Sequence, residues 1–257
     1  MCGIVGIFNL DNSKINRDEL IKFNDSLIHR GPDAKGIYIN KENNLGFGHR
    51  RLSILDISNL SNQPMTYHDN RFVIIYNGEI YNFLELKAEL IDLGYKFKTL
   101  GDTEVILASY LNWGEKCQYK FNGMWAFAIW DNKKKKLFIS RDRFGEKPLF
   151  YSKKNKEFFF GSETKFIQSL MDAKINVNDS LIKKNLVYGY KSVHKTNETY
   201  FKNILSFDKS SYSYIDYENN LNIRKYWVPK LKEDKSMSFK DVCHYSEFFL
   251  KKSIEKK

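Results

Sequence analysis

The sequence predicts an α+β protein built from antiparallel sheets, and three observations lead to this class. Strand-like and helix-like segments come in separate clusters, without the regular strand–helix alternation of a parallel sheet. Several strand-like segments show apolar alternation or are joined by tight turns. The chain has 257 residues, of which 42% are hydrophobic and 16% aromatic, so it can bury a substantial core.

The chain is predicted to begin with a strand and a helix. Apolar alternation in CGIVGIF predicts a strand that starts at the terminus itself. The helix is predicted within residues 16–30, because Asn16 and Glu19 have capping-box spacing and apolar residues then recur at helical intervals. Gly31-Pro32 ends this pattern.

Three short strands and two helices are predicted next. The strands lie in KGIYI, LGFGH and RFVIIYN. The helices are predicted at residues 82–93 and 103–113, because Gly94 and Gly114 supply C-terminal stops. Asp102 is placed to be the N-cap of the second helix.

The second half of the chain is predicted to return to strands. These lie in MWAFAIWD, LFISRD, PLFYS and EFFFGS, with a hairpin around Asn132–Lys133 between the first two. A short helix is predicted from Thr164, and residues 172–227 are predicted to mix helix and loop. Residues 228–236 have the composition of a polar linker, and an amphipathic helix follows, with Ser238 and Asp241 in capping-box spacing.

Composition excludes several classes of protein. The three cysteines, Cys2, Cys117 and Cys243, are too few and too widely spaced for a disulfide framework or a CxxC zinc site. Such usage fits a reducing cytosol. The sequence also lacks a signal-peptide pattern and any run of about 18 apolar residues. We therefore expect a cytoplasmic protein with no metal site and no membrane partner.

The net charge of +11 is unevenly distributed, with −1 in residues 1–128 and +12 in the remainder. A basic half can indicate a nucleic-acid partner. Here the lysines are scattered among turns, without a helical stripe or an RNA-binding signature. We expect a solvated basic surface and no nucleic-acid partner.

Cys2 has two interpretations. Free cysteine is among the most buried residue types, so Cys2 can simply be the first residue of a strand. If Met1 is removed, however, Cys2 carries a thiol beside a free α-amine with a reference pKa of about 7.7–8.0. Such an amine can activate its own side chain as a nucleophile. Position alone does not decide between these interpretations.

Two further motifs have a structural and a functional interpretation. Asn77-Gly78, directly after an apolar strand, is a strong hairpin signal and is first interpreted as a turn. It can also supply an amide and a backbone N–H to a developing oxyanion. Of Arg50 and Arg51 in GHRRLSILD, one is expected to be a surface residue, while the other can pair with a carboxylate in bidentate fashion.

Three other polar residues have a similar double interpretation. Asp102 is a helix N-cap by default, but near Glu79 it can hold a substrate ammonium group. His29, in the motif HRGPD, belongs either to an ordinary loop or to a lid over the site. It is also the rival general base for Cys2, in a Cys–His pair.

Taken together, the motifs resemble a known family. In order, the chain contains MCGIVGIF, HRGPD, GHRRLSILD, QPM, YNGEIYN, GDTEVIL, FNGMWAFAIWD, RDRFGEKPLFY and GSETKFI. This set resembles the glutaminase domain of class II glutamine amidotransferases. More narrowly, it is similar to the N-terminal half of glutamine-hydrolysing asparagine synthetases. The resemblance is dense over residues 1–170 and thinner to residue 227.

The resemblance implies a fold and a domain division. The fold is that of the N-terminal-nucleophile hydrolases, a four-layer αββα sandwich of two antiparallel sheets. Residues 1–227 are expected to form the glutaminase domain. Residues 228–257 are expected to form a linker and an amphipathic helix leading toward a synthetase domain that this sequence lacks.

The resemblance also assigns roles to residues of this sequence. Cys2 is the nucleophile, its terminal amine replaces His29 as the base, and Asn77 and Gly78 form the oxyanion hole. The remaining matched positions form the glutamine pocket: Arg51 at the carboxylate, Leu52, Ser53, Ile54 and Leu55 along the wall, and Glu79 and Asp102 at the ammonium group.

The implied function is hydrolysis of L-glutamine to glutamate and ammonia, as part of an asparagine synthetase-like ligase for asparagine biosynthesis. The implied partner is an ATP-pyrophosphatase synthetase domain or subunit. No cofactor is expected in this chain, since ATP and Mg²⁺ belong to that synthetase part. Alternatives are an amidotransferase for another carboxylate, such as a sugar acid, and a non-catalytic remnant that keeps the fold. A homodimer stays open.

Overall fold

The computed structural model describes residues 1–165, 167, 176–189, 196–218 and 221–255. In these residues the strands form two sheets in which neighbouring strands are antiparallel. The first sheet has the order β10-β8-β9-β1-β3-β2, with β1 Gly3–Asn9, β2 Ala34–Ile39, β3 Leu45–Arg51, β8 Phe150–Lys154, β9 Glu157–Gly161 and β10 Leu205–Ser206. The second has the order β12-β11-β7-β6-β5-β4, with β4 Met65–Tyr67, β5 Phe72–Ile80, β6 Gly123–Asp131, β7 Lys136–Arg141, β11 Ser211–Ile215 and β12 Arg224–Lys225.

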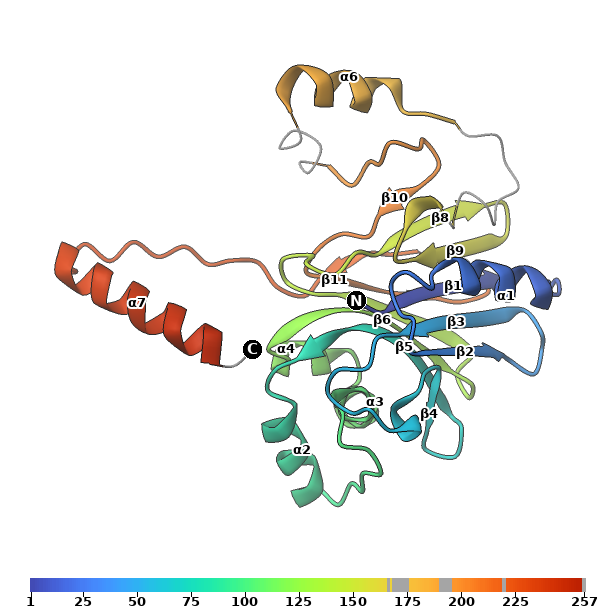
Figure 1. Ribbon diagram of the computed structural model, residues 1–257, viewed down its shortest axis with the longest axis horizontal. Coiled ribbons are helices and arrows are strands. Elements are labelled where there is room, and N and C mark those ends of the chain that lie inside the picture. Colours follow the sequence, from blue (N-terminus) through green and yellow to red (C-terminus); the bar gives the residue numbers. More distant parts are fainter. Residues whose placement is uncertain (166, 168–175, 190–195, 219–220, 256–257) are drawn as a thin grey trace.

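Helices lie outside the two sheets (Figure 1). Their bounds are α1 Arg17–Ser26, α2 Phe83–Asp92, α3 Asp102–Trp113, α4 Cys117–Lys120, α6 Asp179–Tyr188 and α7 Phe239–Glu255, with 3₁₀ turns at Asn59–Ser61 and Gly114–Lys116. Helix α7 stands away from the sheets in Figure 1, and none of its residues is buried.

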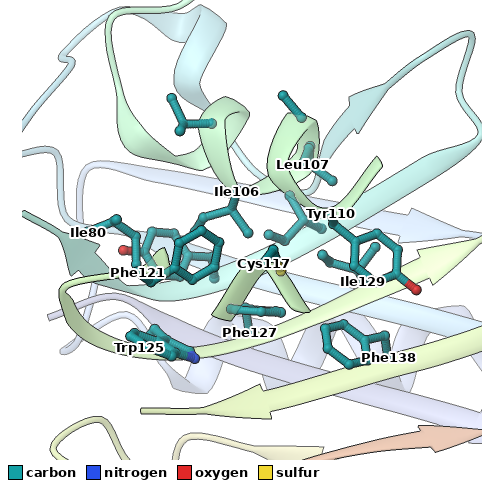
Figure 2. Close-up of a cluster of buried hydrophobic side chains, with 14 of the residues drawn as sticks. Ile80, Ile106, Leu107, Tyr110, Cys117, Phe121, Trp125, Phe127, Ile129 and Phe138 are labelled. Atoms are coloured by element: carbon teal, nitrogen blue, oxygen red, sulfur yellow. The ribbon is translucent and has the colours of Figure 1, made fainter. Parts of the chain in front are cut away.

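Three buried clusters fill the spaces between four layers. Between the sheets, residues of β1 and β3 pack against residues of β5, β6 and β7. The outer face of the first sheet packs on α1. The outer face of the second sheet packs under α2 and α3, where Ile106 and Tyr110 lie over Phe127 and Ile129 (Figure 2). The predicted αββα sandwich is confirmed.

The alternation of side chains along a strand explains how β5 contributes residues to two of these buried clusters. On β5, Phe72, Ile74 and Tyr76 face the helices, whereas Val73 and Ile75 face the first sheet. Successive side chains of a strand point to opposite faces, so a strand buried on both faces is apolar throughout. The sequence pattern RFVIIYN has this character.

Several predicted local signals are confirmed. The side chain of Asn16 accepts hydrogen bonds from the backbone at the start of α1. Ser238 and Asp241 form a reciprocal capping box at the start of α7. Gly94 and Gly114 have φ of 91° and 58° just after α2 and α3, a conformation that favours glycine.

Three local predictions were wrong or incomplete. Asn77-Gly78 is not a turn, because β5 continues to Ile80 and pairs with β6 throughout. Asp102 is not an N-cap: Gly101 occupies that position, and Asp102 begins the helix. Residues 172–227 also contribute β11 to the second sheet beside β7. The predicted helix from Thr164 lies mostly outside the described residues.

Candidate active site

Strand register brings three predicted site residues to one end of the space between the sheets. Ile4 and Phe8 face this space on β1, so Cys2, two residues before Ile4, faces it too. The pairing of Gly3 with Arg50 continues outward to place Cys2 opposite Arg51 on β3. On β5, Asn77 continues the inward-facing positions of Val73 and Ile75.

These residues line one cavity of about 180 Å³. Pockets for drug-sized ligands measure roughly 300–1,000 Å³, so this cavity suits a molecule the size of an amino acid. Ser53 is the one predicted site residue that does not line it; its N–H donates instead to Asp33 Oδ2 at 2.7 Å. The predicted residues along the wall are Cys2, Arg51, Leu52, Ile54, Leu55, Asn77, Gly78, Glu79 and Asp102.

The thiol of Cys2 lies against the backbone of Leu52. Its Sγ is 3.6 Å from the Leu52 carbonyl oxygen and 3.4 Å from the Leu52 nitrogen, which donates to it. Burial raises the pKa of the thiol, although the N–H of Leu52 and the charges of the N-terminus and Arg51 act in the opposite direction. A thiol with a raised pKa needs a base that takes its proton before it can attack.

The HRGPD motif contacts the backbone of Cys2. Arg30 Nε donates to the carbonyl oxygen of Cys2 at 3.0 Å, and Arg30 Nη1 donates to Glu163 Oε1 at 3.2 Å. His29 Nε2 lies 2.8 Å from the same Glu163 oxygen, and its side chain is 47% exposed. His29 therefore contacts Glu163 and does not line the cavity, so the structure gives it no position as the base for Cys2.

The rest of this motif packs on the Arg51 strand. A Cβ at Gly31 would lie 2.4 Å from the carbonyl group of Arg50, so only glycine permits this approach. Asp33 then accepts the N–H of Ser53 and donates its own N–H to the Arg51 carbonyl at 3.0 Å. The motif thus contacts both Cys2 and the segment after β3 that lines the cavity.

Arg51 is 7% exposed, and its guanidinium group donates hydrogen bonds to the loop that follows β3. Its Nη1 donates to the Ser58 carbonyl oxygen and to Asn62 Oδ1, each at 2.8 Å, and its Nη2 donates to the Asp56 carbonyl oxygen. A guanidinium group has five N–H donors. Within the described residues the Nε–H and one Nη2–H have no acceptor.

The amide of Asn77 has an unsatisfied donor. The side chain is 1% exposed, and its buried Nδ2 donates to no acceptor among the described residues. Buried polar groups in native proteins nearly always have partners, so an orphan donor in a cavity points to a ligand. Next to it, a Cβ at Gly78 would lie 2.3 Å from the carbonyl oxygen of Met124, which leaves no room for a side chain.

Asp102 lies at the wall of the cavity, and the residue is 5% exposed. Its Oδ2 accepts hydrogen bonds from the Tyr76 hydroxyl at 2.8 Å and from the Ile80 N–H at 2.9 Å. Burial raises the pKa of Asp102 to about 6, and the nearby Glu79 carboxylate acts in the same direction. Near neutral pH the wall thus carries negative charge suited to an ammonium group.

The sequence analysis missed several residues that line this cavity. Gln63 lies in the motif QPM, which contributed only to the resemblance, and Tyr76 lies in YNGEIYN, of which only Asn77, Gly78 and Glu79 were singled out. Lys147, from RDRFGEKPLFY, is buried, and its ammonium group forms no hydrogen bond or ion pair within the described ranges. The order of these motifs was the one signal that could have found them.

A larger groove of about 750 Å³ lies around β7 and β11. In its lining Lys136 pairs with Asp216 at 3.0 Å, and Tyr212 donates to Glu115 at 3.2 Å. Within the described part of the chain, no cluster of three or more His, Cys, Asp or Glu side chains could hold a metal ion. None of the helices described there is long and apolar enough to cross a membrane.

Comparison with known proteins identifies the family. The model of the glutamine amidotransferase domain matches residues 1–227. A glutamine-hydrolysing asparagine synthetase of Bacillus subtilis is 45% identical over 195 residues, which cover 75% of this chain and 29% of that protein. A putative one of Methanocaldococcus jannaschii is 37% identical over 253 residues, covering 91% and 48%. The chain thus spans less than half the length of these relatives.

Solved structures agree in fold. The glutamine phosphoribosylpyrophosphate amidotransferase of Bacillus subtilis aligns with a TM-score of 0.65 at 17% identity, over 89% of this chain and 50% of that chain. The allosteric regulatory enzyme of purine biosynthesis aligns with a TM-score of 0.67 at 16% identity, over the same shares. The chain belongs to the glutamine amidotransferase domain family, and it matches that part of the glutamine-hydrolysing asparagine synthetases.

Proposed function

We propose that this domain hydrolyses L-glutamine to glutamate and ammonia through a thioester on Cys2. One observation carries the proposal: the Asn77 Nδ2 is a buried donor with no acceptor in the described part of the chain, and Asn77 lines the same cavity as Cys2. A thiol and a preorganised donor in one small cavity are what acyl transfer from an amide needs.

The walls of the cavity suit the charges of a free amino acid. The two free donors of Arg51 can take the α-carboxylate, since guanidinium and carboxylate groups pair in bidentate fashion. Glu79 and Asp102 supply negative charge for the α-ammonium group. The side-chain amide then extends toward Cys2.

The reaction proceeds in two stages. Once Met1 is removed, the α-amine of Cys2 accepts the thiol proton, and the thiolate attacks the side-chain amide carbon. The oxyanion is held by the Asn77 amide and the Gly78 N–H. The protonated amine gives its proton to the departing nitrogen, which leaves as ammonia. Water then cleaves the thioester and releases glutamate, which restores the thiol.

The asparagine synthetases that this chain resembles suggest where the ammonia is used. In a glutamine-hydrolysing asparagine synthetase of Bacillus subtilis this domain forms only part of the protein. We infer that a synthetase domain or subunit, which binds ATP and Mg²⁺, receives the ammonia and forms asparagine in the cytoplasm. Another carboxylate acceptor, such as a sugar acid, is the alternative product route. A homodimer also remains open.

The test is release of glutamate and ammonia from L-glutamine by the purified protein with Met1 removed, as checked by mass spectrometry. The matched control is Cys2→Ala, which should fold and release neither product. Release at equal rates by both proteins would exclude Cys2 as the nucleophile. Glutamine binding without release by the native protein would favour a non-catalytic remnant.

A further inference from the structure

Tyr76 is held by three hydrogen bonds from segments other than its strand partner β6. Its N–H donates to Gln63 Oε1 at 2.7 Å, and its hydroxyl donates to Asp102 Oδ2 at 2.8 Å. Its carbonyl oxygen lies 3.1 Å from Nε2 of His49. Burial lowers the pKa of His49 to about 4, so the ring is neutral and Nε2 is the donor. The residue directly before Asn77 is thereby fixed from three sides.

The hydrogen bond from the Tyr76 N–H to Gln63 occurs where β5 extends beyond its pairing with β4. Strand β4 pairs with β5 only as far as Met65 opposite Ile74. Beyond that point no strand among the described residues pairs with this edge of β5, and the side chain of Gln63 accepts the N–H of Tyr76 instead. The end of β5 that carries Asn77 is therefore positioned by side chains.

We propose that Tyr76 is a positioning residue of this site, whose hydroxyl holds the Asp102 carboxylate at the cavity wall in the ionised form that receives the substrate ammonium group. This inference rests on the proposed hydrolysis of glutamine. It adds a residue whose ring faces away from the cavity core, toward α3, and whose hydroxyl acts through Asp102.

The hydroxyl of Tyr76 affects the ionisation of Asp102. Burial favours the neutral carboxylic acid at Asp102, and the hydrogen bonds from Ile80 and Tyr76 oppose that preference. Tyr76 is itself buried, and its pKa lies well above the usual value, so the phenol donates and does not ionise. Titratable or charged groups from several elements share this cavity with Asp102. They are Glu79 on β5, the N-terminus and Cys2 before β1, Arg51 on β3, Asp56 in the loop after β3, and Lys147 after β7.

The experiment is the pH profile of kcat/KM for glutamine in the native protein and in Tyr76→Phe. The acid limb of this profile reports two ionisations of the free enzyme: that of the Cys2 α-amine, which both proteins share, and that of Asp102, whose pKa is about 6. The ratio of kcat/KM between the two proteins cancels the shared α-amine titration and leaves the part of the limb that Asp102 sets. Loss of a hydrogen bond to the ionised carboxylate should move the limb upward by about one pH unit, with about a fivefold loss of kcat/KM at pH 6. The loss should be in KM, and it should vanish at high pH, where Asp102 is ionised in both proteins.

The matched control is Tyr110→Phe. Tyr110 is a residue of α3 that is buried in the same cluster as Tyr76 (Figure 2) and does not line the cavity. A purely structural role for tyrosine hydroxyls would lower the melting temperature of both variants and leave both acid limbs at the native position. An unmoved limb in Tyr76→Phe overturns the inference.

Calorimetric titration of glutamine into Cys2→Ala, with and without Tyr76→Phe, separates this inference from the proposed function. It measures binding without turnover, so it does not depend on the nucleophile. Weaker binding of the double variant at pH 6, with recovery at pH 8, supports the inference. Glutamine binding with equal pH dependence in both proteins overturns the inference and leaves the proposed function intact. No release by the native protein and no binding overturns both.

Discussion

Asn77→Ala tests the proposed oxyanion hole most directly. The substitution removes the amide whose Nδ2 is buried and has no acceptor in the described residues. If that donor is reserved for a transition state, its loss should lower kcat and leave glutamine binding almost unchanged. Loss of one oxyanion donor costs about 10²–10³ in kcat, or roughly 2.7–4 kcal/mol.

The structure also predicts a small effect on folding. A buried donor without a partner costs about 1–3 kcal/mol, and alanine removes that cost. The same change loses the packing of a side chain that is 1% exposed. These effects oppose each other, so we expect the free energy of unfolding to change by less than about 1 kcal/mol.

Asn44→Ala is the matched control, since Asn44 is another fully buried asparagine. It lies just before β3, at the opposite end of that strand from Arg51, and its Nδ2 donates to Asn12 Oδ1 at 2.9 Å and to the Tyr217 hydroxyl at 3.1 Å. Here alanine breaks satisfied hydrogen bonds. We expect a loss of about 1–3 kcal/mol in stability and an unchanged kcat.

The assay combines steady-state glutamate release with thermal unfolding for the native protein and both variants. The expected pattern is opposite in the two variants: Asn77→Ala loses turnover and keeps stability, while Asn44→Ala does the reverse. A native kcat in Asn77→Ala, or a change confined to KM, would refute the assignment of Asn77 as an oxyanion donor.

Three further predictions address the other parts of the site. Arg51→Lys should weaken glutamine binding severely, because a point charge cannot replace a bidentate fork; unchanged affinity in calorimetry would remove Arg51 from the carboxylate site. An N-terminal extension left before Cys2 should abolish glutamate release, since an amide nitrogen cannot accept the thiol proton, and substantial activity of the tagged protein would reopen the case for His29. Gly31→Ala should lower the free energy of unfolding by about 1–3 kcal/mol, measured by denaturant titration, because its Cβ would meet the Arg50 carbonyl at 2.4 Å; native stability would show that the loop can move aside.

Signals confined to a few neighbouring residues were predicted from the sequence. The cap at Asn16, the stop at Gly94 and the capping box at Ser238 depend on contacts within one turn of a helix. The strand that became β5 was predicted because its apolar run is itself the cause of burial on both faces. Such features need no knowledge of distant segments.

Features that depend on distant partners were not predicted from local patterns. Asn77-Gly78 has the composition of a turn, but β6, more than 40 residues away, pairs with it and keeps it in a strand. Asp102 has the position of an N-cap, but Tyr76 and Ile80 hold its carboxylate at the cavity wall. Strand β11 was missed for the same reason, since it exists only beside β7.

The candidate site shows the same division. The order of motifs along the chain was enough to nominate Cys2, Arg51 and Asn77, and strand register explains why they meet. What the sequence alone could not decide is which donors and acceptors stay free once the chain has folded. Tertiary packing decides three such features: which N–H groups of Arg51 have acceptors, that the Asn77 amide has none among the described residues, and that the Tyr76 hydroxyl donates to Asp102. Only packing determines which polar groups find a partner in the protein and which are left for a ligand.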